Sequence, residues 1–338
     1  MQTVACPAAS MNTSGVTEFI FVGLPHSRLI HLLLFAVVLA CYVVVLFGNL
    51  LIVVTVYSEP CLLQSPMYFF LTHLSILDIA FGSVAVPRLL GDLVKHSSAI
   101  SFGGCMSQLF FFHFFGGSEM LILVLMAYDR YMAICYPLMY MTSMNRPRCT
   151  KLLILCWIGG FIHSISQMIP ILWFPFCGPN ELDNFFCDAQ QVVNLACTDT
   201  YITEILVAAN SGLLCLVCFT ILLVSYGVIL ATLRGHFRES GRKALSTCSS
   251  HLVVVTLLFL PCLFVYVLPF SSSVQKVVSV FYTVITPGLN PIIYTLRNQE
   301  MKEAMGRIRN KSIFSHCCVN QHKIRVISPK NPILIPVP

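Results

Sequence analysis

Long apolar segments alternate with short polar connectors along most of this 338-residue chain. Seven of these segments run for about twenty residues or more with few charges, which is enough for a helix to cross a ~30 Å hydrocarbon core. We therefore predict an all-α membrane protein built as a seven-transmembrane helix bundle. The predicted spans are Leu29–Tyr57, Met67–Gly91, Phe102–Ile134, Thr150–Phe174, Ile202–Leu233, Ala244–Phe270 and Val277–Leu296.

Composition supports this prediction, because 57% of the residues are hydrophobic and only 10% are charged, whereas soluble domains carry about a quarter charged residues. The connectors are short, so we expect one membrane domain, residues 29–297, between an outer tail, 1–28, and an inner tail, 298–338. Residues 1–10 have neither a basic stretch nor an apolar core. We therefore expect no cleavable signal peptide and assign the first span as an uncleaved anchor.

Basic residues fix the expected orientation, because positively charged loops stay in the cytoplasm. With the N-terminus outside, four of the 20 basic residues fall outside and sixteen inside. The net charge of +6 thus reflects the membrane topology and gives no argument for nucleic acid. Asn12 begins a glycosylation sequon on the outer tail, as this orientation requires.

Five of the sixteen cysteines fall in the expected outer segments: Cys6, Cys105, Cys177, Cys187 and Cys197. The last three lie at ten-residue intervals in one loop, and a bridge from Cys105 would hold that loop over the bundle. Four cysteines allow three pairings, which the sequence leaves open. A zinc site is disfavoured because the loop lacks histidine and CxxC spacing. In the inner tail, Cys317 and Cys318 are either palmitoylated or free.

Asp129 and Arg130 end the apolar third span. Arg130 follows Cys105 by 25 residues, or about 37 Å of helix, so both belong at the cytoplasmic edge. Adjacent residues of a helix point in different directions, so one can face the bundle and the other water. A plain membrane-edge pair explains their depth equally well.

Asp78 and Glu119 reach a shared depth near the midplane, about 16 Å from the inner face by helix rise. Two bare carboxylates are not expected there, so they would share a proton or bind a cation such as sodium. Asn49, Asn290 and Ser75 offer further oxygens nearby. Hydrogen-bonded packing without an ion is the alternative.

The last span and the segment after it carry two further signals. Pro291 would interrupt the helical hydrogen bonds, and such kinks are common at moving parts. Residues 298–310 place Met301, Met305 and Ile308 on one face with basic residues opposite. This pattern predicts a short amphipathic helix on the inner membrane surface.

With these features in hand, the chain resembles the vertebrate odorant (olfactory) receptors among the rhodopsin-like G-protein-coupled receptors. The similarity runs in order from Met11 to about Arg309. It is carried by "GN" at Gly48, "PMYFFLTHLSILD" at 66–78, "MAYDRYMAICYPLMY" at 126–140, "SY" at Ser225, "KALSTCSSH" at 243–251 and "PGLNPIIYTLRN" at 287–298. The chain departs from the family pattern at Leu245, at Gly288 and at 258–260, where Leu-Phe-Leu replaces a more usual Phe-Tyr-Gly.

The resemblance implies an odorant as ligand, and a stimulatory G protein that activates adenylyl cyclase in olfactory neurons, at the plasma membrane. It also implies disulfides Cys105–Cys187 and Cys177–Cys197. A G-protein-facing switch would centre on Arg130, restrained by Asp129. Its further members would be Tyr131, Tyr226, His251 and Tyr294.

Depth counting places the ligand site in the outer half of the bundle. The candidates are Phe112, His113, Gly116, Gly117, Met120, Asn210, Ser211, Phe259, Cys262 and Tyr266. The two glycines either open a cavity or allow close helix packing, and His113 is a hydrogen-bond partner, a metal ligand or a packing residue. Cys105 to Ser118 contains no acid, which disfavours amines. We therefore predict a small, neutral, mostly hydrophobic ligand.

Other protein classes fit less well. Asp92 and Asp129 lie at opposite membrane faces and cannot form an aspartyl protease dyad, and there is no HExxH zinc motif. A transporter would show internal repeats or paired broken helices. We therefore expect no enzyme activity, and the main alternative is a chemoreceptor of the same fold outside the olfactory epithelium.

Overall fold

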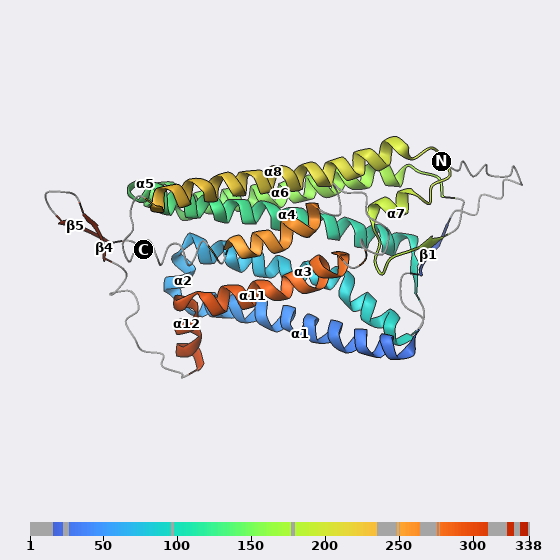
Figure 1. Ribbon diagram of the computed structural model, residues 1–338, viewed down its shortest axis with the longest axis horizontal. Coiled ribbons are helices and arrows are strands. Elements are labelled where there is room, and N and C mark those ends of the chain that lie inside the picture. Colours follow the sequence, from blue (N-terminus) through green and yellow to red (C-terminus); the bar gives the residue numbers. More distant parts are fainter. Residues whose placement is uncertain are drawn as a thin grey trace, which may run out of the picture.

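The computed structural model shows an elongated bundle of roughly parallel helices (Figure 1). It describes residues 16–22, 27–95, 98–176, 180–234, 249, 251–263, 276, 278–309, 323–327 and 332–336. Several predicted features lie outside these residues, namely Cys6, Asn12, Cys177, Leu245, Tyr266, Cys317 and Cys318.

Five helices in the described part of the chain are long and apolar enough to cross a membrane. They are α1 (Arg28–Ser58), α3 (Pro66–Lys95), α4 (Phe102–Cys135), α6 (Arg146–Leu172) and α8 (Tyr201–Arg234). These ranges agree with the first five predicted spans to within a few residues. Helix α4 lies at the centre, because it contacts α3, α6 and α8.

The last two predicted spans are described in part. Residues 251–263 form a helix within the sixth span. In the seventh, a π-helical turn, η1 (Phe281–Ile285), leads into α11 (Thr286–Arg297). The irregular turn therefore precedes Pro291, and α11 stays helical across this proline.

Asn49 of α1 explains why Pro291 is tolerated. A proline lacks the N–H that would bond the carbonyl four residues earlier, which here belongs to Pro287. The Asn49 side-chain amide donates to that carbonyl at 3.2 Å and to the Val45 carbonyl at 3.0 Å. A Cβ on Gly48 would lie 2.8 Å from Pro291 Cγ. The "GN" pair thus lets α11 approach and satisfies its unpaired carbonyl.

The two ends of the bundle differ in structure (Figure 1). One end carries a small sheet of β1 (Glu18–Phe21), β2 (Ala99–Ser101) and β3 (Glu181–Leu182), in the order β2-β1-β3, together with α7 (Ala189–Val193). The other end carries α2 (Pro60–Gln64), α5 (Pro137–Ser143) and α12 (Gln299–Arg309), and the hairpin of β4 (Lys323–Ile327) and β5 (Pro332–Pro336) follows in the chain.

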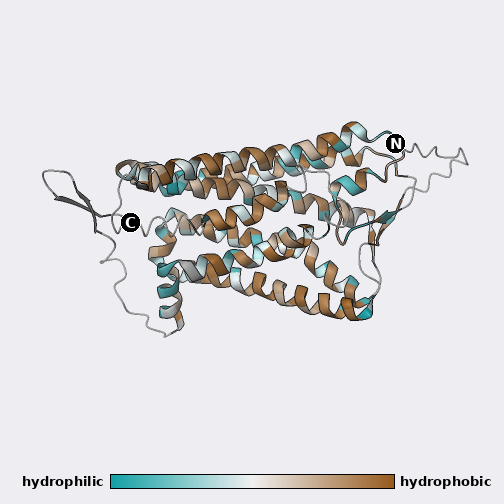
Figure 2. Ribbon diagram, in the orientation of Figure 1, coloured by the Kyte–Doolittle hydropathy of each residue, from teal (hydrophilic) through white to brown (hydrophobic). Residues whose placement is uncertain are grey.

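Hydrophobic residues predominate along the helices of the bundle (Figure 2), and many of their side chains are exposed on its outside. On α1, for example, Phe47 is 68% exposed and Leu32 is 62% exposed. Exposed apolar surface on this scale marks contact with a membrane rather than water.

Candidate functional site

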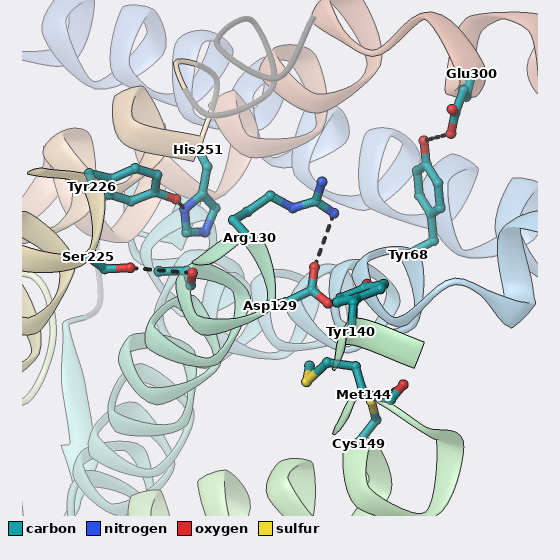
Figure 3. A network of polar contacts seen from close by, with 11 residues as sticks. Tyr68, Asp129, Arg130, Tyr140, Met144, Cys149, Ser225, Tyr226, His251 and Glu300 are labelled. Carbon is teal, nitrogen blue, oxygen red and sulfur yellow. Dashed lines mark hydrogen bonds and ion pairs between the residues drawn. The ribbon is translucent and has the colours of Figure 1, made fainter. Parts of the chain in front are cut away.

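A buried polar network lies at the end of the bundle that carries α5 and α12 (Figure 3). Asp129 of α4 is fully buried, and its Oδ2 lies 3.1 Å from Nη2 of Arg130, whose side chain is 20% exposed. The hydroxyl of Tyr140 on α5 donates to Asp129 Oδ1 at 2.8 Å. Burial and the charge of Asp129 raise the pKa of Tyr140, so it keeps its proton at neutral pH. Asp129 and Arg130 therefore form a direct ion pair. The sequence did not predict this contact, because adjacent residues of a helix point in different directions.

Two further groups flank Arg130 in Figure 3. On one side, the Tyr226 hydroxyl is hydrogen-bonded to His251 Nδ1, and Tyr294 lies near His251 with ring centroids 6.5 Å apart. On the other, Tyr68 donates to Asn298 Oδ1 at 3.0 Å and to Glu300 Oε2 at 2.8 Å. The structure thus groups the predicted switch residues Asp129, Arg130, Tyr226, His251 and Tyr294. Tyr131 lies apart, in edge contact with Tyr136.

Helix α12 occupies the range predicted for the amphipathic helix, and it packs against the bundle. Met301 and Ala304 are fully buried, and Arg307 forms an ion pair with Glu59 at 3.3 Å. Part of its apolar face therefore contacts protein, whereas Ile308 is 40% exposed.

The midplane acids are both buried and interact electrostatically. Nδ2 of Asn290 donates to both oxygens of Asp78, at 3.0 and 3.1 Å. Within the described residues, neither oxygen of Glu119 has a hydrogen-bond partner of good geometry, although Asp78 and Asn290 lie close to it, and Asn290 Oδ1 has no such partner either. Buried oxygens without a hydrogen-bond partner can ligate a cation, and a carboxylate oxygen can instead take up a proton. These residues are therefore compatible with the predicted sodium site.

A cavity of about 40 Å³ lies beside Glu119, among α3, α4, α6, α8, the 251–263 helix and η1. His113 and His163 meet there with ring centroids 5.6 Å apart. Ser211 is held by the side-chain amide of Gln167. The complete lining is Phe81, Phe112, His113, Gly116, Gly117, Glu119, Met120, His163, Ser211, Leu214, Leu258, Cys262 and Tyr282. It combines an apolar wall with a few polar groups, as small-molecule sites do.

Seven of the ten predicted ligand residues line this cavity, and two do not. Asn210 donates to the Ser166 hydroxyl at 2.7 Å, and Phe259 is buried against Phe219. Each is next in sequence to a true lining residue, Ser211 or Leu258. Asn210 and Phe259 thus lie at the level of the cavity while their side chains point elsewhere, because one residue turns the side chain by about 100°.

Six lining residues were not among the predicted ligand residues, namely Phe81, Glu119, His163, Leu214, Leu258 and Tyr282. His163 lies on α6, where no ligand residue was predicted, and Tyr282 lies on the π-helical turn, which no sequence pattern predicted. Glu119 directly follows the acid-free stretch 105–118 and lines the cavity. The absence of acids from that stretch therefore does not by itself exclude amine ligands. Both glycines line the cavity, and a Cβ on Gly117 would lie 3.4 Å from Gly160 Cα and 3.0 Å from His163. Gly117 thus serves close packing as well.

The outer loop is fixed to this site by a disulfide between Cys105 and Cys187, as predicted. Cys187 N also donates to Gln108 Oε1 at 2.9 Å, and the neighbouring Phe186 stacks on Phe112 with centroids 5.1 Å apart. Cys197 also takes part in a disulfide; its pairing with Cys177 stays a prediction. No group of three or more metal-ligating side chains occurs among the residues that the structure describes.

Comparison with known proteins decides the family. A family profile described as "Olfactory receptor" matches residues 38–311. The chain is 58% identical to human olfactory receptor 4Q3 over 299 residues, covering 88% of this chain and 96% of that protein. The chain belongs to the olfactory receptor family.

Further relatives agree with this assignment. The olfactory receptor is 54% identical to human olfactory receptor 4K14, over 89% of this chain and 98% of the relative. It is 52% identical to mouse olfactory receptor 4E2, over 90% and 99%. Squid rhodopsin shares the fold, with a TM-score of 0.68 at 16% identity, over 90% of this chain and 93% of that one. The protein is therefore a multi-pass membrane receptor of seven-helix fold, and its family is not one of enzymes.

Proposed function

We propose that this olfactory receptor binds a small, mostly hydrophobic, neutral molecule in the cavity around His113. Binding activates a stimulatory heterotrimeric G protein at the plasma membrane and raises cyclic AMP. The observation that carries the proposal is the position of the cavity and the Asp129–Arg130 network on the same central helix, α4. The cavity end, with the outer loop and its disulfide, faces outside, and the network end faces the G protein.

The size of the cavity defines how a ligand enters. At about 40 Å³ it holds only a few water molecules, since about 10–15 Å³ of such space takes one water. An odorant therefore has to displace wall side chains. Met120 is an unbranched wall residue with several rotatable bonds, and Leu258 faces it from another helix. We propose that this expansion moves α4 against its neighbours and reaches Arg130.

The test is a cyclic-AMP screen of cells expressing the receptor against a broad odorant panel that includes amines. We expect responses to neutral compounds, and Arg130→Ala abolishes them at unchanged surface expression. The matched control, Arg28→Ala, changes an exposed arginine at the first residue of α1, and it retains the response. Normal signalling by Arg130→Ala would refute the switch. Responses confined to amines would refute the neutral ligand and assign Glu119 as their counter-ion.

We further propose that Asp78, Glu119 and Asn290 hold a sodium ion or a shared proton. Support comes from the orphaned oxygens of Glu119 and Asn290 beside the Asn290–Asp78 contact. The potency of an agonist should then shift with sodium concentration or pH, and Glu119→Gln should remove the shift. Equal potency under all conditions, in the wild type and in Glu119→Gln, would reduce the pair to packing.

A further inference from the structure

A groove of about 770 Å³ lies between α4, α6 and α8 of the receptor. It lies away from the ligand cavity, in the half of the bundle that contains Asp129. We define the sterol groove by its fourteen lining residues: Leu121, Val124, Leu125, Ala127, Tyr128, Tyr131, Leu152, Leu155, Cys156, Thr220, Ile221, Val224, Ser225 and Val228. Neither the odorant cavity nor the switch explains this hollow.

The groove is continuous with the lipid-facing surface of this membrane protein. Its rim residues Leu155, Ile221 and Val224 are 61%, 48% and 62% exposed. Exposed apolar side chains also continue beyond it on the same helices, at Ile158 and Leu216. In a bilayer, its occupant therefore comes from the lipid phase.

The length of the groove matches one membrane leaflet. Along α4 it runs from Leu121 to Tyr131, which is ten residues or about 15 Å of helix. Half of a ~30 Å hydrocarbon core is also about 15 Å. Tyr131 lies one residue from Arg130 at the cytoplasmic edge, so the groove spans the inner leaflet.

Its volume is too large for one acyl chain of that length. A carbon atom of packed hydrocarbon takes roughly the ~30 Å³ that a water takes in the liquid, so the groove holds about 25 carbon atoms. An extended chain advances about 1.2 Å per bond, so a single acyl chain fills about half of it. A fused-ring lipid, about two chains wide, fills it at the same length.

The chemistry of the lining points to a neutral lipid with a hydroxyl group. None of the groove residues is charged, so nothing in it pairs with a phosphate or a carboxylate. Its polar side chains are four hydroxyls and one thiol, and Tyr128 and Tyr131 place two of the hydroxyls at the inner-edge end. Hydroxyls donate to and accept from another hydroxyl.

We propose that the sterol groove binds one membrane sterol from the inner leaflet, with its rings against α6 and α8 and its hydroxyl beside Tyr128. The binding is independent of odorant. It stabilises the packing of α4 against α6 and α8.

The experiment uses the full-length receptor in lipid nanodiscs with a photoreactive cholesterol analogue that carries a diazirine on its ring system. Leu155→Trp fills the groove. Ile162→Trp is the matched control, because Ile162 lies on the same helix, is equally exposed at 61% and does not line the groove. We expect saturable labelling of groove residues on α6 and α8, competed by unlabelled cholesterol. Leu155→Trp lowers this labelling at least fivefold, and Ile162→Trp leaves it within twofold of wild type.

Three outcomes would overturn the proposal. The first is labelling that does not saturate, or that falls equally in both variants. The second is competition by phospholipid alone, which would assign the groove to acyl chains. The third is labelling that is lost in nanodiscs holding two receptor copies, which would make the face a dimer contact. If Leu155→Trp does not reach nanodiscs in folded form, Ile221→Trp on α8 replaces it with the same expected loss.

Discussion

At the scale of single residues, Asn49 joins two helices whose contact the sequence did not reveal. Its side-chain amide bonds the Pro287 carbonyl, which lacks a donor because residue 291 is proline. Asn290, next to that proline, then holds Asp78 through both of its oxygens. The side chains of Asn49 and Asn290 therefore connect α1, α3 and α11.

Replacing Asn49 by alanine should lower receptor stability, because the buried Pro287 carbonyl loses its donor. Such a loss costs about 1–3 kcal/mol. The measurement is the apparent Tm of the purified receptor in nanodiscs. Asn210→Ala serves as control, because Asn210 is only partly buried and its acceptor, the Ser166 hydroxyl, also bonds the His163 carbonyl. A loss of Tm in Asn210→Ala as large as in Asn49→Ala would contradict this assignment.

Sequence reasoning at this scale found residue types and depths, but not partners. Asp78 and Glu119 emerged because acids in an apolar span are costly. The Tyr140–Asp129 bond did not, because Tyr140 lies on a separate short helix eleven residues later. Partners across helices depend on rotation and packing, which depth counting does not supply.

At the scale of elements, the contact between α4 and α6 depends on small residues. A Cβ on Gly160 would lie 2.1 Å from Ser118 Oγ and 2.7 Å from the Phe114 carbonyl oxygen. The backbones therefore approach closely at the level of the ligand cavity. Close approach through small residues is a common basis of helix association in membranes.

Gly160→Ala should therefore separate α4 from α6. Overpacking of this kind costs about 1–3 kcal/mol, which corresponds to a fall of roughly 3–10 °C in Tm. Gly227→Ala on α8 is the control, since nothing lies within 4 Å of a Cβ there. It should hold or slightly raise the Tm, because alanine favours helix over glycine. Equal Tm values for the two variants would show that the α4–α6 contact tolerates a methyl group.

Helix positions were the most predictable elements, because apolar runs of sufficient length have few alternatives. The π-helical turn at 281–285 was not predictable, since its sequence, FYTVI, carries no proline or glycine. This turn places Tyr282 on the cavity wall. Because the turn was not predicted, Tyr282 was not predicted as a lining residue either.

At the scale of the whole molecule, α4 joins the proposed ligand cavity to the proposed switch. The disulfide Cys105–Cys187 holds the outer loop so that Phe186 stacks on the cavity residue Phe112. At the other end, Asp129 and Tyr140 hold Arg130 in the bundle. The fold and family followed from the sequence. The small size of the cavity did not, because it depends on how thirteen residues from different elements fill one space.

The central claim, that ligands bind in this cavity, is tested most directly by changing its size at Leu258. The measurement is the half-maximal concentration of a homologous series of agonists in the cyclic-AMP assay. Leu258→Ala enlarges the cavity, and Leu258→Val enlarges it less. Leu260→Ala is the control, because Leu260 lies two residues later, is 44% exposed and does not line the cavity. Surface expression is measured for every variant.

A buried methylene contributes about 0.8 kcal/mol, or a factor of about four in affinity. The account predicts that Leu258→Ala shifts the preference toward longer homologues by about fourfold per added methylene group, that Leu258→Val shifts it less, and that Leu260→Ala keeps the wild-type order. An unchanged order in both Leu258 variants at normal surface expression, or the same shift in Leu260→Ala, would contradict it.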